Sequence, residues 1–168
     1  MMMREIKATE LQENPFTLFQ QKWALVSAGT KEKCNTMTVS WGGVGVFWNK
    51  NVATIYIRPQ RYTKEFIDAQ ETFSISVLPE DYRKALQYCG AHSGRETQDK
   101  FEAAGLTKAF DGDTPYVEEA EMVFVCRKLC EGDIDPATFS DGEYDGMFYP
   151  EKDYHRYYIA EILKVMVR

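Results

Sequence analysis

The feature that most constrains this chain is a two-residue alternation of apolar and polar side chains, seen in several short segments. Asn35–Trp41, Asn51–Pro59 and Thr72–Pro79 show it most clearly. This period is that of a β-strand with one face on a core and the other facing solvent. The sequence therefore predicts a sheet of short strands. Further strand candidates are Trp23–Gly29, a part of 116–129 and the C-terminal segment 154–168.

Short helical segments interrupt these strands without alternating regularly with them. A helix is predicted over 61–70, with Thr63 as its N-cap, and another from Pro79 to Tyr88, stopped by Gly90. A doubly wound parallel sheet needs regular alternation of strands and longer helices. We therefore predict one mainly β domain over residues 1–168, an antiparallel barrel with a few short inserted helices.

Composition excludes several classes of function. The formal net charge is −6 and the pI about 5.0, whereas nucleic-acid binding favours a basic surplus, so we expect no nucleic-acid partner. Four cysteines without a CxxC pair and only two histidines argue against a zinc site and favour reduced thiols. The N-terminal segment has no signal-peptide core and no apolar run is long enough to cross a membrane. We expect a cytoplasmic protein with no membrane partner.

The "GGVG" segment, Gly42–Gly45, raises the question of a dinucleotide phosphate loop. That fingerprint needs GxGxxG between a strand and a helix. Here Trp48 stands in place of the third glycine, and a strand follows. The pattern therefore excludes a Rossmann loop. We interpret the glycines as a bend or bulge in a curling sheet, with close approach of a cofactor as the alternative.

Two basic segments are candidates for an anion site. Arg58 and Arg61 precede a predicted helix start, where Thr63 adds a hydroxyl, and guanidinium groups match phosphate oxygens. The turn at Ser93–Arg95, followed by Lys100, could hold a second edge of a phosphate. Solvated surface cations beside an ordinary helix cap are the alternative for both segments.

His155 and the acidic segment 131–153 complete the candidates. His155, placed in the last predicted strand, is a candidate acid, hydrogen-bond donor or structural residue, and no serine or cysteine motif pairs with it. Three roles stay open for 131–153, which we predict to be a long loop: a lid, a specificity loop or plain surface.

In their order along residues 14–167, these segments resemble the flavin reductase-like family, the FMN-binding split barrels that include flavoredoxins. The resemblance rests on "NTMTVSW" (35–41), "RPQRYTKEFI" (58–67), "FSISVLP" (73–79), "CGAHSGRETQDKF" (89–101) and "DYHRYYIAEI" (153–162). It implies a split β-barrel, non-covalently bound FMN and a homodimer. It also implies an NAD(P)H:flavin oxidoreductase, or else a flavoredoxin-like electron carrier with a redox protein partner. A barrel for another flat ligand or a protein partner is the third hypothesis.

The resemblance also assigns cofactor-binding residues by position. Along the flavin ring and ribityl chain it places Asn35, Thr36, Met37, Thr38, Ser40 and Trp41. On the ribityl and phosphate oxygens it places Arg58, Arg61, Tyr62, Thr63, Ser93, Gly94, Arg95 and Lys100. His155 is expected near the flavin. Hydride transfer to a flavin needs positioning and electrostatics more than an acid–base residue, so these residues are expected to bind and orient.

Overall fold

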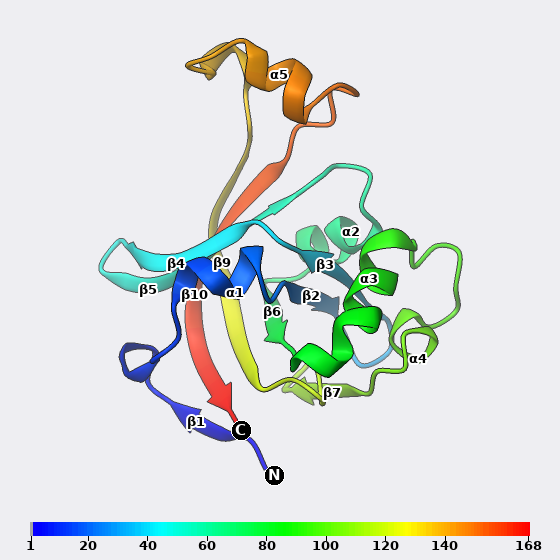
Figure 1. Ribbon diagram of the computed structural model, residues 1–168. Coiled ribbons are helices and arrows are strands. Elements are labelled where there is room, and N and C mark those ends of the chain that lie inside the picture. The colour runs from blue at the N-terminus through cyan, green and yellow to red at the C-terminus, as the bar shows by residue number, and fades with distance from the viewer. Residues whose placement is uncertain (1) are drawn as a thin grey trace.

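The computed structural model describes residues 2–168, in which an eight-stranded sheet follows the order β3-β2-β6-β9-β10-β5-β4, with β1 added on β10 (Figure 1). Every strand pair is antiparallel, which confirms the predicted class. The strands are β1 (Arg4–Ile6), β2 (Ala24–Gly29), β3 (Cys34–Val39), β4 (Gly42–Phe47), β5 (Lys50–Ile57), β6 (Thr72–Val77), β9 (Met122–Asp133) and β10 (Arg156–Val167). A separate hairpin pairs β7 (Lys108–Asp111) with β8 (Thr114–Val117).

The predicted alternation sorts the side chains of the strands between core and surface. On β5, Ala53, Ile55 and Ile57 are fully buried in the main core, whereas Tyr56 and Thr54 on the opposite face are partly exposed. The other long strands of the sheet contribute to the same apolar cluster. The strands therefore curve around one core, as in a barrel.

The glycines of β4 form no bulge, so that part of our interpretation of "GGVG" was wrong. β4 pairs with β5 residue for residue, from Gly42 with Ile55 to Phe47 with Lys50. A Cβ on Gly42 would lie 2.7 Å from the Phe19 ring, so this glycine lets a helix pack closely on the strand. Trp48 and Asn49, both with positive φ, form the turn between β4 and β5.

Three short helices cover one side of the barrel, beside β2 and β3: α2 (Tyr62–Ala69), α3 (Arg83–Ala91) and α4 (Lys100–Ala103) (Figure 1). Of the others, α1 (Pro15–Gln20) packs on β4 and α5 (Glu143–Phe148) lies apart from the barrel. The 3-10 turns are η1 (Ala8–Glu10), η2 (Glu80–Tyr82) and η3 (Pro136–Thr138). Two predicted boundaries were wrong. The N-cap of α2 is Arg61, so Thr63 lies inside the first turn, and α3 runs through Gly90 to Ala91.

Residues 134–155 form an arm that stands away from the barrel at the top of Figure 1. The predicted loop over 131–153 needs correction, because β9 continues to Asp133, and η3 and α5 lie in the arm. His155 ends the arm one residue before β10, and its carbonyl accepts a hydrogen bond from the Ile134 backbone. The expected position of His155 in the strand was therefore off by one residue.

Within residues 2–168, no helix has the length and apolar character needed to cross a bilayer. All four cysteines are free thiols: Cys89 and Cys126 are buried, and Cys34 and Cys130 are partly buried.

Candidate functional site

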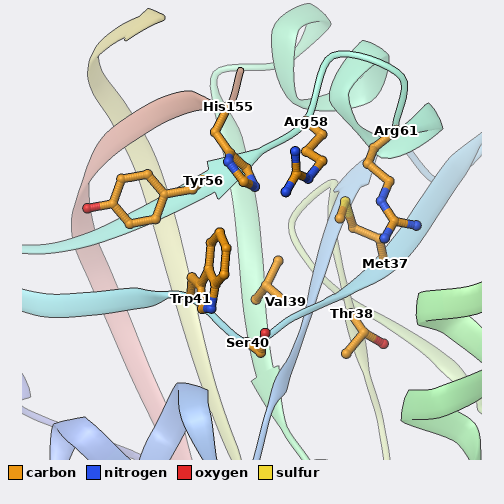
Figure 2. A pocket seen from close by; sticks show the side chains of 9 residues that line it. All are labelled: Met37, Thr38, Val39, Ser40, Trp41, Tyr56, Arg58, Arg61 and His155. Atoms are coloured by element: carbon orange, nitrogen blue, oxygen red, sulfur yellow. The ribbon is translucent and has the colours of Figure 1, made fainter. Parts of the chain in front are cut away.

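Two adjoining cavities form one groove at the end of β3, because Met37, Arg58 and Arg61 line both of them. The first, of about 210 Å³, is lined by Met37, Thr38, Val39, Ser40, Trp41, Tyr56, Arg58, Arg61 and His155 (Figure 2). The second, of about 470 Å³, is lined by Asn35, Met37, Arg58, Gln60, Arg61, Tyr62, Thr63, Ala91, His92, Ser93, Gly94, Glu96, Lys100 and Asp153. We name the first the aromatic end of the groove and the second the cationic end.

The wall shared by both ends is β3, an edge strand. It pairs with β2 on one side only, so backbone N–H and C=O groups along its other edge stay available to a ligand. Its side chains divide between groove and core. Thr36 points into the core, where its hydroxyl bonds Ser27 and the Val26 carbonyl. Thr36 can thus contact a ligand in the groove only through its backbone.

The start of α2 is held against β3 by a buried polar contact. The Asn35 amide donates to the Thr63 hydroxyl at 2.9 Å, and both side chains are buried. Thr63 therefore fixes the approach of the first turn of α2 to the strand. The outward backbone N–H groups of that turn lie beside the cationic end, where they favour an anion.

Two cations at the cationic end lack acidic partners. Within residues 2–168, neither Arg61 nor Lys100 forms an ion pair, although Arg61 donates to the Gly90 carbonyl. Lys100 is only 4% exposed. Burial, with a contribution from Arg61, lowers its pKa from 10.5 to about 8. Burial also lowers the pKa of Arg61, and Arg58 adds to that effect. A buried charge without a counter-ion is costly, so a negative charge at this end would be favourable.

The turn at Ser93–Gly94 closes the cationic end by close packing. A Cβ on Gly94 would lie 2.2 Å from Asn35 Oδ1, so only glycine fits here without displacing Asn35. Arg95, predicted to bind phosphate, points elsewhere. Its guanidinium pairs with Glu65 and stacks 4.5 Å from the centre of the Tyr62 ring. The structure thus brings Ser93 and Gly94 to the groove and leaves Arg95 outside it.

Trp41, Tyr56 and His155 converge at the aromatic end. Figure 2 shows the imidazole reaching into the cavity beside Tyr56 and Arg58. The centres of the Trp41 and His155 rings are 5.3 Å apart. His155 is 7% exposed, and burial, followed by the positive charge of Arg58, lowers its pKa from 6.5 to about 4. His155 is therefore a neutral hydrogen-bonding group at pH 7.

Arg58 attaches the arm beside the aromatic end. The guanidinium donates to the Phe148 carbonyl at 3.0 Å and pairs with Asp153 at 2.8 Å. Gln60 donates to the other Asp153 oxygen at 2.7 Å. Phe148 meets Trp41 edge to face, 5.9 Å between ring centres. Arg58, predicted to hold ribityl and phosphate oxygens, is engaged by the arm in this structure.

The groove collects most of the predicted site residues and adds some that sequence reasoning missed. The predicted residues that line it are Asn35, Met37, Thr38, Ser40, Trp41, Arg58, Arg61, Tyr62, Thr63, Ser93, Gly94, Lys100 and His155. The missed lining residues include Tyr56, Gln60 and Asp153. Tyr56 shares a strand face with Arg58, a signal that the alternation already contained. No local signal pointed to Asp153, because the folding of the arm brings it to the groove.

Comparisons with known proteins identify the family of this chain and structures of similar fold. The model of the flavin reductase like domain matches residues 16–168. The search of curated proteins found no match. Solved structures are similar in fold. An FMN-binding domain of a flavin reductases-like enzyme from Shewanella baltica OS155 is 18% identical, with a TM-score of 0.71 over 98% of this chain and 76% of that chain.

Two further structures with a similar fold carry different functional names. Flavoredoxin of Desulfovibrio vulgaris (Miyazaki F) is 24% identical, with a TM-score of 0.65 over 87% of this chain and 69% of that chain. An NADH:FAD oxidoreductase from Streptomyces globisporus C-1027 is 15% identical, with a TM-score of 0.66 over 88% of this chain and 76% of that chain. Since the family model covers nearly the whole chain, this protein belongs to the flavin reductase-like family and has its split-barrel fold.

Proposed function

We propose that this protein binds FMN in the groove along β3 and acts as an NAD(P)H-dependent flavin oxidoreductase. The observation that carries the proposal is the polarity of the groove. One end holds the buried Lys100 and the partly buried Arg61, neither with an acidic partner among residues 2–168, and the other holds Trp41, Tyr56 and a neutral His155. FMN has the same polarity, a phosphate at one end and a flat ring at the other.

The cationic end fits a phosphate dianion. The phosphate would be the anionic partner that Arg61 and Lys100 lack among residues 2–168, and the Ser93 hydroxyl would be a further hydrogen-bond donor. The first turn of α2 contributes backbone donors. The cost of burying Lys100 and partly burying Arg61 would then be offset by the ligand, which supports phosphate and not a neutral group at this end.

The edge of β3 fits the ring of FMN. Unpaired backbone groups from Met37 to Trp41 can hydrogen-bond the polar edge of a heterocycle, while Trp41 and Tyr56 offer aromatic faces. Bound FMN would supply the chemistry, accepting a hydride and passing electrons on. The residues of the chain bind and orient, and none is needed as an acid or base for hydride transfer.

An absorbance spectrum of the purified protein, with and without added FMN, tests the binding claim. A flavin band that stays with the protein through gel filtration supports it. A colourless protein that takes up no FMN refutes it and favours a barrel for another ligand. Stopped-flow mixing with NADH and with NADPH then tests the activity: bleaching of the flavin band is expected with at least one, and none with either would refute the reductase.

A second candidate is a flavoredoxin-like electron carrier that receives electrons from a redox protein. The observation that favours it is the edge-to-face contact of Phe148, on the arm, with Trp41 at the aromatic end. A nicotinamide must stack on the flavin ring, and a Phe148 ring beside Trp41 would restrict that access. Bound FMN that resists both nicotinamides but is reduced by a protein donor would establish the carrier.

We also propose a homodimer. The edge strand β4 and the turn after it carry the exposed apolar side chains Val46 and Trp48, and a second copy could cover them. Analytical ultracentrifugation tests this proposal, with a single species at twice the mass of 19.4 kDa expected. A monomer at all concentrations would refute it.

A further inference from the structure

Tyr149, on the arm, makes a contact with His155 that no sequence pattern predicted. Its hydroxyl oxygen lies 2.8 Å from His155 Nδ1, and both side chains are buried. Within residues 2–168, this is the one hydrogen bond between side chains that either residue makes. The pair is held in place by neighbouring contacts. The Tyr149 ring stacks near Phe139 and lies 5.1 Å from the Arg58 guanidinium.

The direction of this hydrogen bond follows from counting protons. A neutral imidazole carries one N–H, and the phenol carries one O–H. If Nδ1–H donated to Tyr149, the phenol proton would have no acceptor among residues 2–168, and a buried donor without an acceptor costs about 1–3 kcal/mol. If Tyr149 donates to Nδ1, the phenol is satisfied, and the imidazole proton must sit on Nε2.

The surroundings agree with this direction. The charged groups that face His155 are Arg58 and Arg61 from the body and Asp153 from the arm, and Tyr56 is the neighbouring phenol. The N–H groups of Arg58 are directed to the Phe148 carbonyl and to Asp153, and no hydrogen bond from it reaches His155. No donor therefore competes to make Nε2 the acceptor.

We propose that Tyr149 is a positioning residue, which fixes His155 in the tautomer with its proton on Nε2 and so presents an N–H donor to the groove. The ring reaches into the cavity in Figure 2, where Nε2 is the nitrogen farther from the backbone. The arm thereby sets the polarity of one hydrogen-bonding group at the aromatic end. That end selects a ligand with an acceptor, such as a ring carbonyl, at this point.

The tautomer is a property of the protein alone, whereas its effect on FMN rests on the proposed function. Long-range ¹H–¹⁵N correlation of ¹⁵N-histidine-labelled protein, free of FMN at pH 7, reads the tautomer directly. The wild type is expected to show His155 with Nε2 protonated and Nδ1 bare. In Tyr149→Phe, the population of this tautomer is expected to fall at least severalfold relative to the other.

Tyr154→Phe is the matched control. It removes the hydroxyl of a ring whose centre lies 4.9 Å from that of Tyr149. That hydroxyl donates to Asp145 and not to His155. Its His155 tautomer should match the wild type. The His155 pKa should stay well below 6.5 in both variants, because burial and Arg58 hold it there. A merely structural role of Tyr149 would leave the tautomer unchanged.

The proposal is overturned if wild-type His155 carries its proton on Nδ1, or if folded Tyr149→Phe keeps the wild-type tautomer. The wild-type spectrum is decisive even if the variant fails to fold. With FMN, Tyr149→Phe should weaken binding by about two- to tenfold, the range for one hydrogen bond, and Tyr154→Phe by less than twofold. An Nε2-protonated His155 in a protein that never binds FMN would refute the proposed function and leave the positioning role standing.

Discussion

The two ends of the groove handle positive charge in opposite ways. At the cationic end, Lys100 is buried and Arg61 partly buried, and neither has an ion pair among residues 2–168. At the aromatic end, Arg58 is already paired with Asp153 and bonded to the arm. The three cations come from neighbouring parts of the fold and line one groove. Only two of them are left to a ligand.

This difference assigns two roles to the cations of the groove: those at the cationic end bind a ligand, and Arg58 holds the arm. Buried charges without partners destabilise the ligand-free protein and favour the complex, so the cationic end is expected to carry most of the affinity for a phosphate. A charge that holds the arm stabilises the protein itself and sets access to the aromatic end. Each prediction below tests one side of this division.

The largest effect is expected from Lys100→Met. Loss of a charged hydrogen-bond donor to phosphate should raise the Kd for FMN by about 10- to 100-fold. The same change should leave the ligand-free protein as stable as the wild type or more so, because it removes a buried unpaired charge. Isothermal titration with FMN and thermal melting without FMN measure the two effects.

Arg95→Gln is the control for this variant. Arg95 is exposed and paired with Glu65 outside the groove, so its loss should change the Kd by less than about threefold. Equal losses of affinity in the two variants, or a ligand-free Lys100→Met that melts well below the wild type, would contradict the division between the ends.

Gly94→Ala should be the next largest effect, on the free energy of unfolding. The new methyl group would displace the Asn35 side chain and disturb its bond to Thr63, at a cost of about 1–3 kcal/mol. Gly43→Ala is the matched control, because a Cβ there meets nothing within 4 Å. Urea unfolding measures both. A cost at Gly94 no larger than that at Gly43 would show that the turn can move away from β3.

The barrel could be predicted from the sequence because each strand carries its own signal. The faces of Asn51–Pro59 follow from local alternation, and Ile55 and Ile57 are buried as that pattern requires. The glycines of β4 led to a wrong prediction. A glycine in a strand indicates that a larger side chain is excluded, but the sequence does not show which neighbour excludes it. At Gly42 the cause is Phe19, distant in the chain.

The cationic end was predictable in composition but not in its pairing. Arg61 and Arg95 look alike in sequence, yet one lines the groove and the other pairs with Glu65 on α2. The arm was the least predictable part. Helix α5 was not predicted because its segment is acidic and rich in turn residues. The contacts of Asp153 and Tyr149 depend on how the whole arm folds.

A smaller effect is expected in the pH dependence of stability. The pKa of Lys100 is about 8 in the folded protein and 10.5 ordinarily, so the unfolded chain binds more protons between these values. The free energy of unfolding should therefore rise with pH in this window, by at most about 1.4 kcal/mol per pH unit from this group. Lys100→Met should lack this contribution. Urea unfolding at pH 7.5 and 9.5, without FMN, measures the difference in slope between the two proteins, and equal slopes would contradict a buried unpaired lysine.

The smallest effect is expected from the pair that ties the arm. Arg58 and Asp153 are partly exposed, so Asp153→Asn should cost less than about 1 kcal/mol of stability and change the Kd for FMN by less than about threefold. The His155 pKa is a more sensitive measure of this pair, because Arg58 lowers it and Asp153 raises it. Arg58→Gln should therefore move the His155 pKa up from about 4 toward 6.5, and Asp153→Asn should move it further down. An NMR titration of the His155 ring measures both. Shifts in the same direction would mean that the charge of the arm does not reach the aromatic end, and that Arg58 is as free for a ligand as Arg61.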